Sequence, residues 1–242
     1  MNVSLTQAAA AMNASARWQD VIAQNLSASS VPGFKKQDIS FESVAAGKVQ
    51  NAQMPLAHVA TNFQQGEMRP TGVPTDVAIE GDGFFEVQLP NGGTAYTRDG
   101  EFQVSAQGEL VTKQGYSVLS DSGPIQINLN NPAPLSVSAD GTISQGAESK
   151  GKLKITAFSN PELLAPAGFG QYRANDPHLQ SSAVTSPTVR QGYLEAGNVS
   201  PVVEMANLIT AMRQYEANQK VVQTQDDRMG RAITELGNPN PS

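Results

Sequence analysis

A long helical pattern near the C-terminus constrains the fold of this 242-residue chain more than any other feature. Beyond position 201, apolar residues recur at alternating spacings of three and four, as in helices that pack along one seam. Ser200 is a suitable N-cap, Pro201 a suitable first helical residue, and Gly237 a suitable stop. The seam residues that we predict to lie in a helix–helix interface are Met205, Leu208, Met212, Tyr215, Val222, Met229 and Ile233.

A second, shorter helix is predicted at the N-terminus, from residue 3 to about residue 28. It is rich in Ala and Ser, and small side chains let helix axes approach closely. The heptad spacing here is thinner, and its predicted interface residues are Leu5, Met12, Ile22 and Leu26. This helix could serve the core of its own domain, but its few large apolar residues favour packing against other helices, within the chain and between copies.

A stop separates the N-terminal helix from the rest of the chain. Pro32-Gly33 suits the centre of a type II turn, in which the residue after the proline must adopt a positive φ, as glycine does without penalty. Phe34 follows directly and is expected to anchor the chain where it leaves the helix. Residues 37–75 are polar and are predicted to be irregular.

The middle of the chain is predicted to be β-structure, from Asp76 to about Phe158. Short apolar segments alternate there with turn sequences, of which Gly81-Asp82-Gly83, the 90–93 and 98–102 stretches and Asp140-Gly141 are typical. Residues 159–190 contain four prolines and are expected to be loop-like. Short strands joined in this way favour a barrel or a sandwich.

The predicted fold class is therefore α+β. Paired N- and C-terminal heptad helices would form a coiled-coil tube domain, with a central β-rich barrel- or sandwich-like domain. The predicted division is residues 1–32 for the N-terminal helix, 33–75 for an extended linker, 76–190 for the β-rich body, and 191–242 for the C-terminal junction and long helix.

Composition argues against several classes of function. The net charge is −6 and the pI about 4.9, which disfavours binding to nucleic acid. The chain has no cysteine, which excludes thiolate zinc sites and cysteine nucleophiles. His58 and His178 lie in polar stretches without partners, so we predict no enzyme, no cofactor and no small-molecule substrate. We also expect no stable membrane insertion.

Three collinear stretches resemble the bacterial flagellar rod and hook family. The first stretch, "IAQNLSASSVPGFKKQ", is similar to an N-terminal signature that reads Asn-Leu-Ala-Asn and then Thr-x-Gly-Phe-Lys. Ser27, Ala28 and Val31 depart from it. The matching or adjoining residues are Asn25, Leu26, Pro32, Gly33, Phe34 and Lys35.

The other two stretches match more closely. Residues 71–119 resemble the central segment of the family around Asp-Val-Ala-Ile, Gly-x-Gly-Phe-Phe and Ala-Tyr-Thr-Arg-Asp-Gly, with the motif residues Asp76, Gly81, Gly83, Phe84, Phe85, Tyr96, Arg98, Asp99 and Gly100. Residues 191–227 resemble its C-terminal signature, with the motif residues Gly192, Tyr193, Glu195, Asn198, Val199, Glu204, Met205, Arg213, Tyr215, Glu216, Asn218 and Lys220.

The resemblance implies a structural axial subunit that assembles helically, with its terminal helices in an inner tube, and transmits motor torque to the hook. Its partners would be other copies, neighbouring axial rod proteins and the flagellar export apparatus. Its place would be the periplasm-spanning rod of the basal body, reached without a cleaved signal peptide. The short segment between the first two motifs favours the proximal-rod type. A distal-rod or hook-type protein is the alternative, and a secreted β-rich adhesin or binding module a more distant one.

Overall fold

The computed structural model of the chain describes residues 3–45 and 53–237. The chain divides into two compact units, which we describe separately. Unit 1 comprises residues 1–27, 37–60 and 200–242, and unit 2 comprises residues 28–36 and 61–199.

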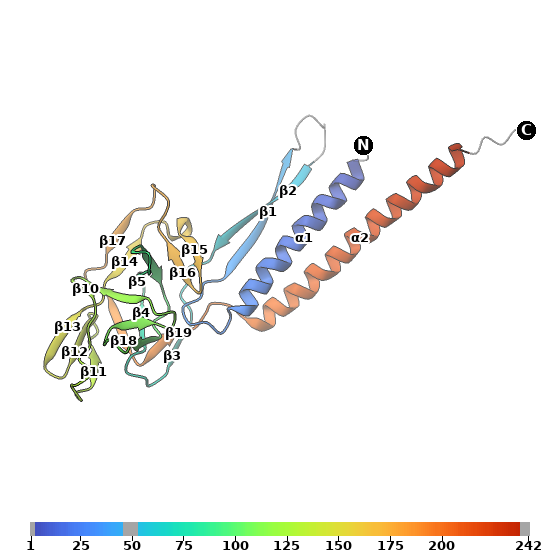
Figure 1. The fold of residues 1–242 in the computed structure, drawn as a ribbon. Coiled ribbons are helices and arrows are strands. Elements are labelled where there is room, and N and C mark those ends of the chain that lie inside the picture. Colours follow the sequence, from blue (N-terminus) through green and yellow to red (C-terminus); the bar gives the residue numbers. More distant parts are fainter. Residues whose placement is uncertain (1–2, 46–52, 238–242) are drawn as a thin grey trace, which may run out of the picture. The chain divides into compact units, whose positions relative to one another are not determined.

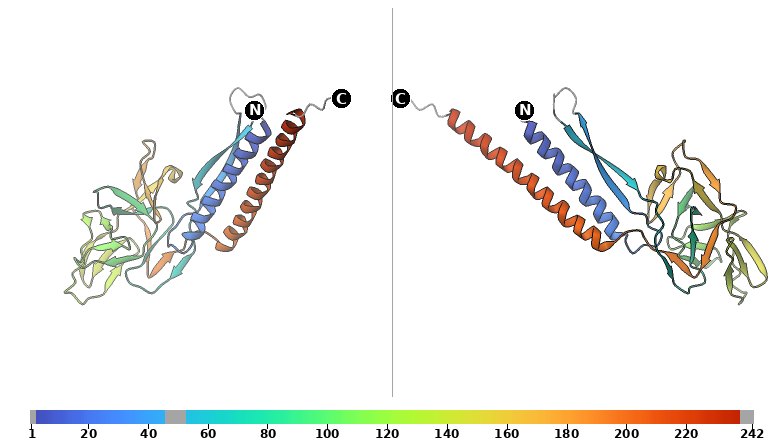
Figure 2. Two further views of the ribbon diagram at one scale, coloured as in Figure 1. Left: turned by 45° about the vertical axis from the view of Figure 1, so that its right-hand side comes forward. Right: turned by 180° about the vertical axis from the view of Figure 1, so that it is seen from behind.

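Unit 1 consists of two helices and a pair of strands. Helix α1 spans Val3–Ser27 and helix α2 spans Pro201–Gly237, and they lie side by side in opposite directions (Figures 1 and 2). Strands β1 (Gln37–Ala45) and β2 (Gln53–Thr61) pair with each other, and β1 packs along α1. Because α2 is 37 residues long and α1 only 25, the C-terminal turns of α2 extend beyond α1 (Figure 1).

The ends of both helices agree with the local sequence. Helix α1 ends at Ser27, before the turn that contains Pro32. Helix α2 begins at Pro201, with Glu204 in its first turn near the positive end of the helix dipole. Pro239, expected to lie beyond the end of the helix, is outside the described residues.

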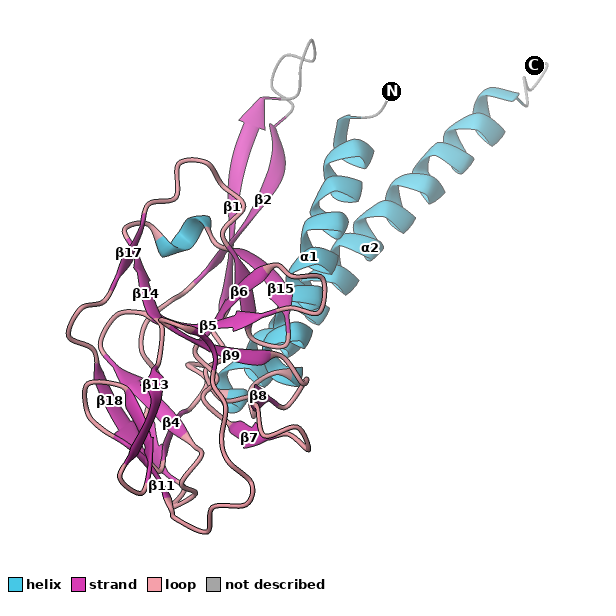
Figure 3. Cartoon of the chain, turned by 60° about the vertical axis from the view of Figure 1, so that its left-hand side comes forward, coloured by secondary structure: helices cyan, strands magenta, loops and turns pink. Residues whose placement is uncertain are grey.

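Unit 2 is built from short strands and one 3₁₀ turn, η1 (Pro161–Leu163) (Figure 3). Its strands are β3 (Met68–Pro70), β4 (Val77–Glu80), β5 (Phe84–Gln88), β6 (Thr94–Thr97), β7 (Phe102–Val104), β8 (Leu110–Thr112), β9 (Ser117–Ser120), β10 (Gly123–Pro124), β11 (Leu135–Val137), β12 (Thr142–Gln145), β13 (Glu148–Lys152), β14 (Ile155–Phe158), β15 (Ala165–Gly168), β16 (Gln171–Arg173), β17 (Ser181–Ala183), β18 (Thr188–Gln191) and β19 (Tyr193–Glu195).

The largest sheet of unit 2 has ten strands and follows the order β15-β16-β6-β5-β9-β8-β7, with β10, β14 and β17 attached at its side. Strands β11, β12 and β13 form a second sheet, while β4 pairs with β18 and β3 with β19. These last two pairs join segments that lie more than a hundred residues apart in the sequence. Within the described residues the main sheet does not close, so the barrel form of the predicted barrel- or sandwich-like domain is wrong, whereas the α+β class is confirmed.

Two apolar clusters form the core of unit 2. The larger contains Phe85, Val87, Leu110, Val118 and Ile143, each fully or almost fully buried. The smaller is an aromatic cluster, in which the rings of Phe63, Phe84, Tyr96, Phe158 and Tyr172 meet mainly edge to face. Such packing suits aromatic quadrupoles. The core therefore lies mostly within the region that the sequence predicted to be β-structure.

Several local expectations were wrong. The range 37–75 contains β1, β2 and β3 rather than irregular structure alone, and the range 159–190 contains β15, β16, β17 and most of β18 rather than loops alone. In β1 the apolar alternation is short, because only Ile39 and Phe41 alternate with polar residues, and this gives a weak strand signal in the sequence. The 98–102 turn joins β6 to β7, which are not neighbours in the sheet, so it is not a hairpin.

Other turn predictions are confirmed. The 90–93 stretch joins the antiparallel pair β5 and β6, and Asp140-Gly141 joins the antiparallel pair β11 and β12. Gly81 and Gly83 both have positive φ, as the predicted turn requires. None of the described helices is both long and apolar enough to cross a lipid bilayer.

Candidate functional site

Helix α2 presents an inner face to the rest of unit 1. Glu204, Ala211, Tyr215 and Val222 lie along this face at spacings that bring successive turns into line, and Ala211 is completely buried. Leu208 lies on the same line and is half-buried. Of the predicted seam, Leu208, Tyr215 and Val222 are therefore brought to the face that packs within the chain.

A second apolar stripe of α2 is exposed. Val202, Met205, Ile209 and Met212 are separated by steps of three and four residues, so they lie on one side of the helix. Their exposed fractions are 75%, 48%, 53% and 49%. Met205 and Met212, predicted as seam residues, thus lie outside the contact between α1 and α2. The seam residues predicted from the heptad spacing are therefore divided between the inner face and this exposed stripe.

The C-terminal turns of α2 expose the continuation of its inner face. Met229 and Ile233 follow Val222 at steps of seven and four, but their exposed fractions are 37% and 72%. They lie on the part of α2 that extends beyond α1 (Figure 2). The predicted seam residues Met229 and Ile233 are therefore not covered by α1, which covers the N-terminal turns of α2.

Helix α1 contributes a smaller apolar surface. Ile22 is 2% exposed, while Met12 and Leu26 are half-buried. The side chain of Leu5 lies outside the described part of the chain. Beside this surface, a hollow of about 360 Å³ is lined mainly by small or apolar residues, namely Ala11, Ala14, Ser15, Trp18, Phe41, Gln214, Ala217 and Asn218.

Asn25 connects three elements of unit 1. Its side-chain amide donates to the backbone carbonyl of Gln37 (2.8 Å), and its side-chain oxygen accepts from the backbone N–H of Gln37 (2.9 Å). The same amide donates to the carboxylate of Glu204 (3.4 Å). Asn25 and Glu204 are 1% and 2% exposed. The end of α1, the start of β1 and the first turn of α2 are thereby held together.

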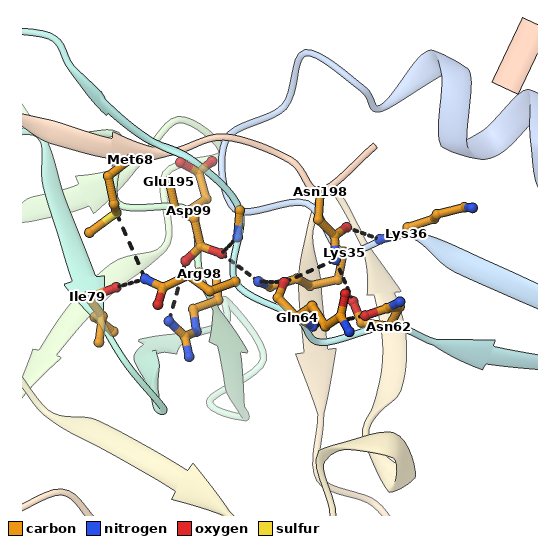
Figure 4. A network of polar contacts seen from close by, with 12 residues as sticks. Lys35, Lys36, Asn62, Gln64, Met68, Ile79, Arg98, Asp99, Glu195 and Asn198 are labelled. Atoms are coloured by element: carbon orange, nitrogen blue, oxygen red, sulfur yellow. Dashed lines mark hydrogen bonds and ion pairs between the residues drawn. The ribbon is translucent and has the colours of Figure 1, made fainter. Parts of the chain in front are cut away.

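A buried group of charges lies in unit 2 (Figure 4). The Lys35 ammonium donates to Glu195 (2.5 Å) and to the carbonyl oxygen of Gln64 (2.7 Å). Arg98 donates to the other Glu195 oxygen (3.3 Å), and the backbone N–H of Gly66 also donates to that carboxylate (2.9 Å). Lys35, Glu195 and Arg98 are 1%, 1% and 5% exposed. Buried charges are tolerated when they are paired in this way.

Opposing effects act on the two cations. Burial lowers the pKa of Lys35, because desolvation disfavours the charged form, while Glu195 raises it. Burial likewise lowers the pKa of Arg98, opposed by Glu195 and Asp82. Arg98 also lies over the ring of Phe84, with its guanidinium carbon 5.2 Å from the ring centre, and donates to the carbonyl of Gly81 (2.7 Å). Arg98 thereby joins the charged group to the main sheet.

Asn198 binds the neighbouring backbone segments. Its side-chain oxygen accepts from the backbone N–H of Lys36 (2.7 Å), and its amide donates to the carbonyls of Asn62 (2.8 Å) and Gln64 (3.0 Å). We call Lys35, Arg98, Glu195 and Asn198, with the backbone of residues 33–36 and 62–66, the junction network (Figure 4).

Gly33 fits the turn that the sequence predicted. Its φ is +66°, and the backbone N–H of Phe34 donates to the carbonyl of Val31 (3.3 Å), as expected for a turn centred on Pro32-Gly33. The N–H of Gly33 donates to the carbonyl of Glu195 (2.7 Å). Phe34 is half-buried and packs close to Gly197.

The remaining motif residues divide between core and surface. Phe84 and Phe85 are core residues, Val199 is 9% exposed, and Tyr96 and Tyr193 are half-buried. A side chain at Gly100 would overlap the carbonyl oxygen of Val77. Gly192 donates its N–H to the carbonyl of Asp76. On α2, Asn218 is half-buried, and the exposed residues are Arg213, Glu216 and Lys220.

Asp99 is a buried acid whose ionisation opposes folding. It is 7% exposed, and burial raises its pKa to about 6, although the N–H of Glu101 donates to it and counteracts the shift. Because the pKa is higher in the folded state, this group stabilises the fold below about pH 4, and the contribution is lost as the pH rises through about 6.

The substitution Asp99→Asn should therefore raise the free energy of unfolding at pH 7 by about 1–3 kcal/mol, since the uncharged amide is cheaper to bury. The gain relative to the unmodified chain should shrink as the pH falls from about 6 to about 4. Urea unfolding at several pH values measures both quantities. If the difference in the free energy of unfolding between the two chains did not change with pH, the buried ionisation of Asp99 would not be its cause.

Sequence reasoning missed the burial of Lys35 and the role of Glu195 as its partner, because Lys is usually exposed and the two residues are 160 positions apart. One signal was present: Lys35, Arg98 and Glu195 come from the three separate motifs. Among residues 3–45 and 53–237 no cluster of potential metal ligands occurs.

Two family models match parts of this chain. Residues 78–145 match the model of the flagellar hook protein FlgE/F/G D1 domain, and residues 190–235 match that of the flagellar basal body rod FlgEFG protein C-terminal region. The flagellar basal-body rod protein FlgF of Caulobacter vibrioides is 37% identical over 91% of this chain and 92% of its own length.

Two further relatives extend the comparison. The flagellar basal-body rod protein FlgG of Borreliella burgdorferi is 37% identical over 94% of this chain and 96% of its own length. The flagellar basal-body rod protein FlgF of Escherichia coli is 32% identical over 88% of this chain and 90% of its own length. The similarity thus covers both units.

Proposed function

Since this chain belongs to the family of flagellar basal-body rod proteins, we infer that its work is structural and that it serves as an axial subunit of the rod. The family is not enzymatic, in agreement with the prediction from the sequence. Rod proteins assemble with other axial proteins of the flagellar basal body, which gives this chain its class of partner and its place. No observation favours an adhesin or a separate binding module.

The exposed apolar faces of α2 are the main observation that supports a proposal about how subunits contact one another. A helix that exposes Val202, Met205, Ile209 and Met212 on one side gains by burying them against another helix, because apolar area removed from water is stabilising. Met229 and Ile233 offer a further surface beyond the reach of α1. We propose that neighbouring subunits cover both surfaces, with Leu5, Met12 and Leu26 of α1 contributing to the same interface, while Ile22, which is 2% exposed, packs within the chain.

Such contacts join different surfaces of successive subunits. Interfaces of this head-to-tail kind produce a helical assembly when the rotation does not close a ring. Packed helices are dense and poorly compressible, which suits a tube that transmits torque. Coiled-coil pairing along the seam and delivery through the flagellar export apparatus without a cleaved signal peptide belong to this proposal.

We further propose that the subunit belongs to the proximal rod. The supporting feature is the short stretch between the first two sequence motifs, from residue 38 to residue 70. The relatives described above include an FlgF and an FlgG protein that are both 37% identical to this chain, so they do not separate the two types. The distal-rod type therefore remains the alternative that the experiment below must distinguish.

Basal bodies from a strain that lacks this gene test both levels of the proposal. We expect non-motile cells whose rods lack part of the proximal segment as well as the distal segment, and full rods after the gene is restored. Images of purified basal bodies measure rod length directly. Rods with a complete proximal segment that lack only the distal segment would identify a distal subunit, and normal rods with normal swimming would contradict the structural role.

A further inference from the structure

We propose that the junction network transmits force between the two units, by tying together the segments through which the chain passes from one unit to the other. This inference rests on the proposed role in the rod. The chain crosses between the units after residues 27, 36, 60 and 199. On the side of unit 2, the crossings lead into three short segments, namely 28–36, 61–66 and 195–199.

Backbone hydrogen bonds join these three segments directly. The N–H of Asn62 donates to the carbonyl of Lys36 (2.8 Å), and the N–H of Gly33 donates to that of Glu195 (2.7 Å). The N–H of Asn198 donates to the carbonyl of Phe34 (3.3 Å). Asn198 adds three side-chain hydrogen bonds, and through them it contacts both of the other segments.

The buried charges of Lys35, Glu195 and Arg98 connect the three segments to the main sheet. Lys35 comes from the first segment, Glu195 from the last, and Arg98 from the end of strand β6. Separating Lys35 from Glu195 would leave a buried charge without its closest partner, which is strongly unfavourable. Tension on any one crossing is therefore shared by the other segments and by the sheet, rather than peeling a single strand away.

Matched variants of the full chain separate this role from general stability. Asn198→Ala removes the bridging amide, and Gln145→Ala is its control, because Gln145 makes three similar bonds to Asn128 and Asn131 away from the crossings. Lys35→Met removes the buried cation. Lys154→Met is its control, because Lys154, just before strand β14, pairs with the buried carboxylate of Glu86 in strand β5.

Two measurements are made on each variant. Native-state hydrogen exchange should accelerate by roughly tenfold or more at the amides of Gly33, Asn62 and Gly66 in Asn198→Ala and Lys35→Met, with core amides such as Val87 unchanged. Strains with these two variants should swim normally in dilute medium, yet lose swimming and shed hook–filament pieces in viscous medium. Strains with the two control variants should keep swimming in viscous medium and should retain their hooks and filaments.

Swimming that equals the unmodified strain at every viscosity, despite faster exchange at these amides, would overturn the proposal. Unchanged exchange at Gly33, Asn62 and Gly66 would also overturn it, because the segments would then be held without the network. Failure of the proposed rod function is distinguishable, since the strain that lacks the gene would then swim normally at every viscosity.

Discussion

Replacing Gly33 with alanine should destabilise unit 2 by about 2–4 kcal/mol, more than an ordinary surface substitution. Two effects add. The φ of +66° is strained for any residue with a side chain, and an added Cβ would lie 2.2 Å from the carbonyl carbon of Arg98 and 2.4 Å from the backbone nitrogen of Asp99. Backbone atoms cannot move aside cheaply, so residues 28–36 would have to leave their place.

Gly72→Ala is the matched control for this prediction. Gly72 has almost the same φ, +71°, but no atom lies within 4 Å of the position that a Cβ would occupy. Only backbone strain should remain, at about 1 kcal/mol. Thermal and urea unfolding of the two variants measure the difference. If Gly33→Ala and Gly72→Ala lowered the free energy of unfolding equally, the close approach of Gly33 to Arg98 would be unimportant.

The substitution Met212→Asp should prevent assembly while the isolated chain keeps its stability to within about 0.5 kcal/mol. Met212 is 49% exposed, so the new carboxylate remains solvated in the free chain. In an assembled rod the same carboxylate would be desolvated without a partner, which costs several kcal/mol. Motility and the melting temperature of the purified chain measure the two outcomes.

Two control variants sharpen this test. Met212→Leu keeps an apolar side chain of similar volume and should assemble normally. Ala211→Asp changes the neighbouring residue, which is fully buried on the inner face, so it should unfold unit 1 in the free chain. Full motility with Met212→Asp, or a loss of stability as large as that of Ala211→Asp, would contradict the division of α2 into an inner and an outer face.

Elements with strong local signals could be predicted from the sequence. The long C-terminal helix was expected from residue 201 and runs from Pro201 to Gly237, because both its periodicity and its N-terminal residues are local features. The turn at Gly33 was also predictable, since proline followed by glycine strongly favours one turn geometry. The family resemblance, carried by three motifs, gave the function.

Features that depend on distant partners could not be predicted. The close approach of Gly33 to Arg98 joins residues 65 positions apart in the sequence, and a turn alone would have left unit 2 unaffected by a substitution there. The heptad line marked Met212 and Tyr215 equally, although only Tyr215 faces the interior of unit 1. Which side of a helix meets its own chain depends on the partner helix, and periodicity alone does not contain that information.

Chemical labelling of a single thiol at position 212 tests the central claim most directly, that other subunits cover the outer face of α2. The chain has no cysteine, so Met212→Cys introduces a unique thiol. We predict that this thiol reacts rapidly with a polar maleimide in the purified free chain and that it is protected by at least about tenfold in intact basal bodies, with protection lost when the rods are dissociated. Equal reactivity in the free chain and in intact basal bodies would contradict the account, because the outer face of α2 would then remain uncovered in the rod.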